Sequence, residues 1–197
     1  MVSVIYLQAL SEALAGQGQV YFVDAAHFVY GAFLAVVWCF CRTFIKTPSG
    51  RQRLNVLGAL NAVTHQFVSV VNHAYINAQS VCDLLDKLRV LHPGDTLTLV
   101  LDNARYQHCK MVLDHAAKHG IRLLFLPPYS PNLNLIERLW KFIKKDCLNG
   151  RYYPTHQLFQ AAILDSLDAI NTRHKDTLKN TLTLNFQMFD KVQLLAA

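Results

Sequence analysis

The sequence predicts a mixed α/β fold, with a five-stranded sheet made of an antiparallel meander plus parallel strands and flanked by helices. Three observations predict it. Apolar runs rich in β-branched and aromatic residues dominate residues 19–71. Helical spacing and strand-like runs alternate after that point. The length of 197 residues, without internal repeats, suits one domain that buries its own core.

The first half of the chain predicts the antiparallel part of the sheet. The apolar run VYFV forms a short strand that stops at Asp24. Two later runs, joined by the turn-forming residues 61–64, predict a hairpin. The expected elements are a helix over 1–18, strands over 20–23, 34–40, 42–45, 54–60 and 67–71, and a turn over 47–50.

The second half predicts alternating helices and strands. The continuous apolar run at 97–101 is typical of a central strand that is buried on both faces. Pro93-Gly94 and Gly120 end the helices that precede each strand. The expected elements are helices over 81–91 and 111–118, strands over 97–101 and 122–126, a proline-rich turn over 127–131, an amphipathic helix over 134–148, and mainly helix from 154 onward.

The composition excludes several classes of protein. With 52% apolar and 16% charged residues, the chain is not disordered. The longest apolar run, 28–41, has 14 residues and is too short to span a membrane. The start of the chain has no secretory leader, and five scattered cysteines indicate reduced thiols rather than disulfides or a zinc site. We therefore expect a cytoplasmic protein.

The charge distribution points to an anionic partner. The net charge is +6 and the isoelectric point is near 9.1. Residues 1–100 hold 6 basic and 5 acidic residues, whereas residues 101–197 hold 13 and 8. The excess positive charge therefore belongs to the second half, as a site-linked patch requires, although a soluble surface gives the same count.

Three carboxylates stand where elements of the predicted sheet meet. Asp24 ends the first strand, Asp102 ends the central strand, and Glu137 lies in the first turns of the helix after the proline turn. Three convergent carboxylates form an oxygen-ligand set suited to Mg²⁺. Two such ions activate a water or a 3′-hydroxyl at a phosphodiester. The alternative is capping: Asp102 as a helix N-cap, and Glu137 in a capping box with Asn134.

The helix that carries Glu137 has a basic face opposite its apolar face. This face either meets DNA phosphates or is simply solvated. Further candidates would assist the carboxylates or contact the DNA backbone, and the alternative is that they are ordinary surface residues. Trp140 is expected in the core rather than stacked on a base. The DNA-contact candidates are Arg138, Lys141, Lys144, Lys145, Arg51, Arg53 and Arg105, and the auxiliary candidates are Asn103 and His108.

Two motifs stand out after the central strand. One is Asp102-Asn103-Ala104-Arg105, and the other is LPPYSPNLN over 126–134, which runs into IERLW over 136–140. With these motifs the chain resembles the DDE transposases of the mariner superfamily, and their bacterial insertion-sequence branch in particular. The 34 residues between Asp102 and Glu137 are typical of that branch, and the blocks at 22–28 and 49–59 are similar to its earlier motifs.

The resemblance implies a ribonuclease H-like fold that cuts transposon ends and joins the 3′-hydroxyl to target DNA, usually at TA. It implies Asp24, Asp102 and Glu137 as ligands of two Mg²⁺ (or Mn²⁺) ions, with Asp102 bridging. The partners it implies are double-stranded DNA and a second copy in a homodimeric synaptic complex. Asn132 and Leu135 depart from the Asp and Pro of many relatives, in a loop rather than at a ligand.

Relatives also carry helix-turn-helix modules, for which the residues before Asp24 leave no room, so a separate DNA-reading domain or subunit is expected. The expected division is a helical remnant over 1–18, the catalytic domain over 19–172 and a helical tail over 173–197, in a bacterial protein associated with the nucleoid. Two alternatives stay open: a catalytically silent DNA-binding remnant, and a nuclease without strand transfer.

Overall fold

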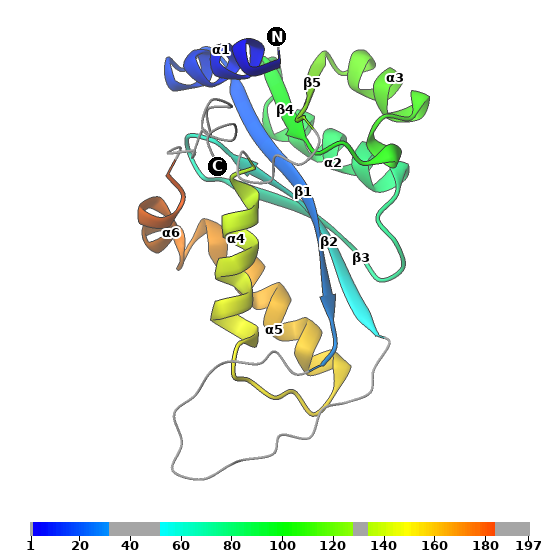
Figure 1. Cartoon of the computed structure of the whole chain (residues 1–197), viewed down its shortest axis with the longest axis vertical. Coiled ribbons are helices and arrows are strands. Elements are labelled where there is room, and N and C mark those ends of the chain that lie inside the picture. Colours follow the sequence, from blue (N-terminus) through cyan, green and yellow to red (C-terminus); the bar gives the residue numbers. More distant parts are fainter. Residues whose placement is uncertain (1, 32–51, 128–133, 184–197) are drawn as a thin grey trace, which may run out of the picture.

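The computed structural model of the protein describes residues 2–31, 52–127 and 134–183, and it contains one mixed sheet (Figure 1). The strand order is β3-β2-β1-β4-β5. The first three strands pair antiparallel, whereas β1, β4 and β5 run parallel to one another. The predicted five-stranded mixed sheet is therefore confirmed. The strands are β1 (Gln19–Val29), β2 (Arg53–Asn61), β3 (Phe67–Asn72), β4 (Leu97–Leu101) and β5 (Ile121–Phe125).

Helices cover both faces of this sheet. Because side chains alternate along a strand, successive residues of β1 enter two different cores. Phe22 packs with residues of α1, α4 and α5, whereas Val23 packs with residues of α2 and α3. Figure 1 shows α4 and α5 together beside the sheet, with α2 and α3 grouped elsewhere. The helical elements are α1 (Val2–Leu14), α2 (Ala78–Leu91), η1 (Arg105–Gln107), α3 (Lys110–Lys118), α4 (Ile136–Ile143), η3 (Lys144–Leu148), α5 (His156–Asp168), η4 (Ala169–Asn171) and α6 (Lys175–Thr181).

Strand β1 differs from its prediction. It continues past Asp24 to Val29, so the aspartate lies within a strand and pairs with Gly58 of β2. Aspartate has a low strand propensity, which is why the sequence pattern indicated a strand end there. The long antiparallel pairing with β2 overrides that local preference, and the polar side chain is retained where it meets α4.

The helix predicted over 134–148 is also corrected. It begins at Ile136, and its last turn, Lys144–Leu148, is a π-helical turn in which the Asn149 amide donates to the Lys144 carbonyl at 2.9 Å. Such a turn inserts one extra residue into the helix and so shifts the direction of the chain after it. The predicted helices over 81–91 and 111–118 and the hairpin are confirmed within three residues at their ends, whereas α1 ends at Leu14, four residues before the predicted end of the first helix. The predicted strands at 34–45 and the turn residues 128–131 lie outside the described residues.

Both end helices contribute to the same core as the sheet. Tyr6 and Leu10 of α1, and Leu178 of α6, are buried in the cluster that contains Phe22. The domain boundaries at 18/19 and 172/173 stay a prediction. In the described part of the chain, no helix has the length and apolar character needed to cross a bilayer. Cys82, Cys109 and Cys147 are free thiols in the described part of the chain.

Candidate active site

The sheet brings Asp24 and Asp102 to one place. Val23 of β1 is in register with Leu101 of β4 in the parallel pair, and each aspartate is the next residue. Neighbouring strands lie about 4.8 Å apart. Since Val23 and Leu101 both face the α2–α3 core, the alternation of side chains directs the following residues toward the α4 side. Two carboxylates from distant parts of the chain thus become neighbours.

Trp140 of α4 holds the Asp24 carboxylate. Its indole Nε1 donates a hydrogen bond to Asp24 Oδ2 at 3.0 Å, while its ring is only 5% exposed. The core position predicted for Trp140 is confirmed, but the sequence pattern did not reveal this hydrogen bond. The ring also makes edge contacts with Phe28 and Phe67. Trp140 therefore couples the packing of α4 to the orientation of Asp24.

Gly58 makes room for that indole. It lies opposite Asp24 in β2, and a Cβ atom placed on it would stand 2.7 Å from the Trp140 ring and 2.7 Å from the Phe67 ring. Real Cβ atoms do not approach other atoms so closely. The glycine is required because α4 lies directly against the sheet at this point.

Glu137 of α4 supplies the third carboxylate, and the three groups repel one another. Burial above all, together with the negative charges of Asp102 and Glu137, raises the pKa of Asp24 to about 7, although hydrogen bonds from the Ala25 backbone and from Trp140 lower it. Burial also raises the pKa of Glu137, with a further rise from Asp102, while Lys141 lowers it. Asp24, Asp102 and Glu137 therefore form one electrostatically coupled group.

The capping alternatives do not hold. The residue that precedes α4 is Leu135, which makes no side-chain capping hydrogen bond, and the N-cap of α3 is Cys109. Asp102 Oδ1 is buried and has no hydrogen-bond partner in the described structure. A buried carboxylate oxygen without a partner is costly. Oxygen donors of this kind, concentrated in one place, fit Mg²⁺ or Mn²⁺.

Asn134 is a residue of this site that the sequence reasoning treated only as a cap. It is 5% exposed, and its Nδ2 donates to the Val23 carbonyl at 3.4 Å, next to Asp24. Its Oδ1 is buried without a partner among the described residues. Its place within LPPYSPNLN was the available signal. Tyr106 was also missed: burial raises its pKa to about 12, helped by the charges of Asp102 and Asp24.

A basic groove lies between α4 and α6, on the same helix as Glu137. Its volume is about 620 Å³, and Arg138, Lys141 and Lys145 line it together with Phe142 and Thr177. Arg138 is anchored there, since its Nη1 donates to the Thr183 carbonyl at 2.6 Å. The groove therefore carries three cations against one carboxylate, Asp146, and two of these cations lie on the helix that carries Glu137.

With this geometry in place, the family assignment follows from sequence. A family model described as DDE superfamily endonuclease matches residues 19–160, more than half of the chain. The chain belongs to the DDE superfamily of endonucleases. The predicted relationship to DDE enzymes is thus confirmed, while the bacterial insertion-sequence branch stays a prediction.

Solved structures place this member of the DDE superfamily among ribonuclease H-like folds. The Mos1 strand transfer complex matches 94% of this chain with a TM-score of 0.60 at 12% sequence identity. The catalytic core domain of BIV integrase matches 78% of this chain and 84% of its own length, with a TM-score of 0.50 at 15% identity. Mos1 paired-end complexes have been solved with Mg and with Mn. These likenesses confirm the predicted fold.

The chain spans about three fifths of the Mos1 transposase, since it covers 60% of that chain. An uncharacterized protein of Sinorhizobium fredii, y4pE/y4sA, is 36% identical over an alignment that covers 23% of this chain and 41% of that protein.

The remaining candidate residues have local contacts or exposures of their own. The guanidinium of Arg53 stacks on the Tyr75 ring at 4.4 Å, and the His108 ring stacks on Phe125 at 3.7 Å between centroids. Asn103 and Arg105 are exposed directly after Asp102, and Lys144 is partly buried outside the groove lining. Arg51 lies outside the described residues.

Proposed function

We propose that this chain is the catalytic domain of a DDE transposase that cuts DNA at transposon ends and joins the 3′-hydroxyl to target DNA. Asp24, Asp102 and Glu137 hold two Mg²⁺ or Mn²⁺ ions. The observation that carries the proposal is the mutual electrostatic coupling of these three carboxylates, which come from β1, the end of β4 and α4. Structural carboxylates are ordinarily paired with cations or hydrogen-bond donors, whereas Asp102 Oδ1 is buried without a partner and the charge of Asp102 raises the pKa of both Asp24 and Glu137.

Each residue has a distinct task in this proposal. Asp102, whose Oδ1 is buried without a partner, would hold the ions together with Asp24 and Glu137. Trp140 fixes one oxygen of Asp24, so the other oxygen keeps a defined direction. When bound, the ions activate the attacking water or 3′-hydroxyl and stabilise the leaving oxygen. Glu137, on a helix packed against the sheet, completes the ligand set from the opposite side.

The basic groove binds the DNA backbone. Lys141 and Lys145 line it beside Arg138, on the helix that carries Glu137. Cations placed here contact phosphates without reading sequence. The proposal also includes a homodimer in the synaptic complex, a DNA-reading domain or subunit, preferential insertion at TA, and a catalytic domain that spans residues 19–172.

A two-step assay tests the function. The purified chain is incubated with supercoiled plasmid and a labelled linear duplex that ends in a 3′-hydroxyl, with Mg²⁺, Mn²⁺ or a chelator. We expect nicking and joining of label to plasmid only with the divalent ion, and neither reaction with Asp102→Asn. Nicking without joined label would indicate a nuclease instead. A chain that retains its fold but neither nicks nor joins would contradict the proposal.

A further inference from the structure

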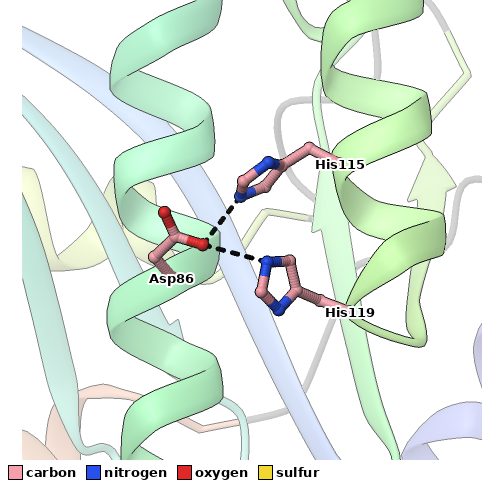
Figure 2. A group of neighbouring side chains, drawn as sticks. All are labelled: Asp86, His115 and His119. Carbon is pink, nitrogen blue, oxygen red and sulfur yellow. Dashed lines mark hydrogen bonds and ion pairs between the residues drawn. The ribbon is translucent and has the colours of Figure 1, made fainter.

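A second cluster of metal-ligating side chains lies between α2 and α3. Figure 2 shows Asp86 on α2 pointing toward His115 and His119 on α3. One carboxylate oxygen, Asp86 Oδ1, contacts Nε2 of His115 at 2.7 Å and Nε2 of His119 at 3.1 Å. The three ligand atoms all lie within 4.8 Å of one another. Helices α2 and α3 pack on one core of the sheet, which contains no residue of α4. The cluster is therefore separate from the three carboxylates of the proposed catalytic site.

Local structure explains why the three side chains meet. His115 and His119 are four residues apart, so they lie on the same side of α3, the second at its C-terminal cap. Between them, Ala116 is buried against α2 and brings the two helices close together. The imidazole rings lie 4.7 Å apart between centroids and tilt by 48°. Both rings therefore converge on the carboxylate rather than stacking on each other.

We propose that Asp86, His115 and His119 form a binding site for a late transition-metal ion of the Zn²⁺ class. In tetrahedral zinc sites the metal–ligand distances are about 2.0–2.1 Å, which separates neighbouring ligand atoms by about 3.3 Å. The distances of 2.7 and 3.1 Å from Asp86 Oδ1 to the two Nε2 atoms are slightly shorter than this. Small side-chain rotations therefore open the cluster enough to admit an ion.

The ligand types select the ion. Imidazole nitrogens favour Zn²⁺, Ni²⁺ and Cu²⁺ over Mg²⁺. The nearby Cys82 thiol does not compete, because burial above all, followed by the charges of Cys109 and Asp86, raises its pKa and keeps it protonated. Cysteine spacing argued against a zinc site in this chain, but that reasoning did not consider a histidine pair and a carboxylate from separate helices.

The site offers three protein ligands and an open position. The side chains of Asp86, His115 and His119 are 49%, 26% and 25% exposed, so solvent reaches the fourth position. A bound ion ties α2 to α3, the helix that follows Asp102 in the chain. The inference does not rest on the proposed function, because it concerns different residues and a different class of ion.

Zn²⁺ titration of the full chain tests the site. Tag-free, chelator-stripped protein is titrated with ZnCl₂ in a calorimeter. We expect saturable binding of one ion at this site, weakened at least about tenfold, or 1.4 kcal/mol, in His115→Ala, in His119→Ala and in Asp86→Asn. Asp83→Asn, on the same helix, and His73→Ala are matched controls that should keep the wild-type affinity. The Asp102→Asn variant should also keep it, which separates this site from the catalytic carboxylates.

Two results overturn the inference. One is the absence of Zn²⁺ binding by the wild-type chain. The other is an unchanged Zn²⁺ affinity in the folded Asp86→Asn and His119→Ala variants, which is expected if Zn²⁺ binds to cysteine thiols or to other carboxylates instead. Asp86→Asn keeps the size of a half-exposed side chain, so it provides a folded variant even if a histidine replacement unfolds the chain. Circular dichroism verifies the fold in each case.

Discussion

The two candidate metal sites of this protein use carboxylates in opposite ways. In the proposed catalytic group, Asp24, Asp102 and Glu137 repel one another. Between α2 and α3, one carboxylate already receives two imidazoles. Without an ion, the first site is electrostatically unfavourable and the second is satisfied. The comparison teaches that the first depends on a cation to relieve its charge, whereas the second needs none for folding.

The largest effect should follow from removing one repelling carboxylate. Asp24→Asn and Glu137→Gln are each expected to lower the rate of Mg²⁺-dependent nicking by at least about a thousandfold, as loss of a member of a catalytic unit does. Asp83→Asn on α2 is the matched control and should nick at the wild-type rate. The measurement is the initial rate of plasmid nicking. If either the Asp24→Asn or the Glu137→Gln variant nicks DNA at the wild-type rate, these carboxylates do not form the catalytic metal site.

A smaller but distinct effect is expected at Gly58. In Gly58→Ala, the new methyl group meets the rings of Trp140 and Phe67 at 2.7 Å. Overpacking of this kind costs about 1–3 kcal/mol of the free energy of unfolding. It should also displace the indole from Asp24 and slow nicking beyond what the stability loss explains. Urea unfolding and nicking rates are measured together. An unchanged stability would mean that α4 does not lie tightly on the sheet.

The pH dependence of ion binding sharpens the comparison further. The pKa of Asp24 is raised to about 7 in the folded protein, above about 3.9 in an unfolded chain. As pH rises between these values, the unfolded state binds fewer protons than the folded one, so the contribution of Asp24 to stability falls. Divalent ions bind the deprotonated form. The increase in Tm caused by Mg²⁺ should therefore grow from about pH 6 to about pH 8.

Asp24→Asn is the control for this dependence. It removes the titrating group, so the effect of Mg²⁺ on Tm should become small and nearly independent of pH. Differential scanning fluorimetry with and without Mg²⁺ measures both proteins. If the increase in the wild-type Tm caused by Mg²⁺ does not change with pH across this range, ion binding does not displace a proton from Asp24.

The smallest effect is expected from the basic groove. Replacing Lys141 and Lys145 with Ala should reduce the salt dependence of DNA binding by about two units of slope, since each phosphate contact contributes about 0.9. Lys110 and Lys118 are exposed on α3, and their joint replacement is the matched control. Fluorescence anisotropy across a salt series gives the slopes. Equal slopes for both double variants would mean that the α4 face is only solvated.

Much of the fold follows from local sequence patterns. The apolar run Leu97–Leu101 predicted the central strand, and Pro93-Gly94 and Gly120 marked helix ends that the structure confirms. The extension of β1 past Asp24 was missed, because pairing with β2 decides it and local propensity opposes it. The π-helical turn after Ile143 was likewise outside the reach of a 3.6-residue periodicity.

The candidate site, too, was predicted from the sequence only in part. The three carboxylates were predicted from their positions at element boundaries and from the family motifs. Their electrostatic coupling agrees with that prediction, while their catalytic roles stay a proposal. Trp140 was read as apolar core, because nothing in a helical pattern indicates that its indole reaches a strand 116 residues earlier. The cluster of Asp86, His115 and His119 was missed for a similar reason: its partners lie on separate helices.

Anomalous diffraction from crystals soaked in MnCl₂ tests the central claim most directly. We predict manganese peaks among the carboxylate oxygens of Asp24, Asp102 and Glu137, and no peak of comparable height between Asp86, His115 and His119. Both parts follow from the preference of Mn²⁺ for oxygen ligands. Manganese at the histidine cluster, with none at the three carboxylates, would contradict the assignment of these carboxylates as the catalytic metal site.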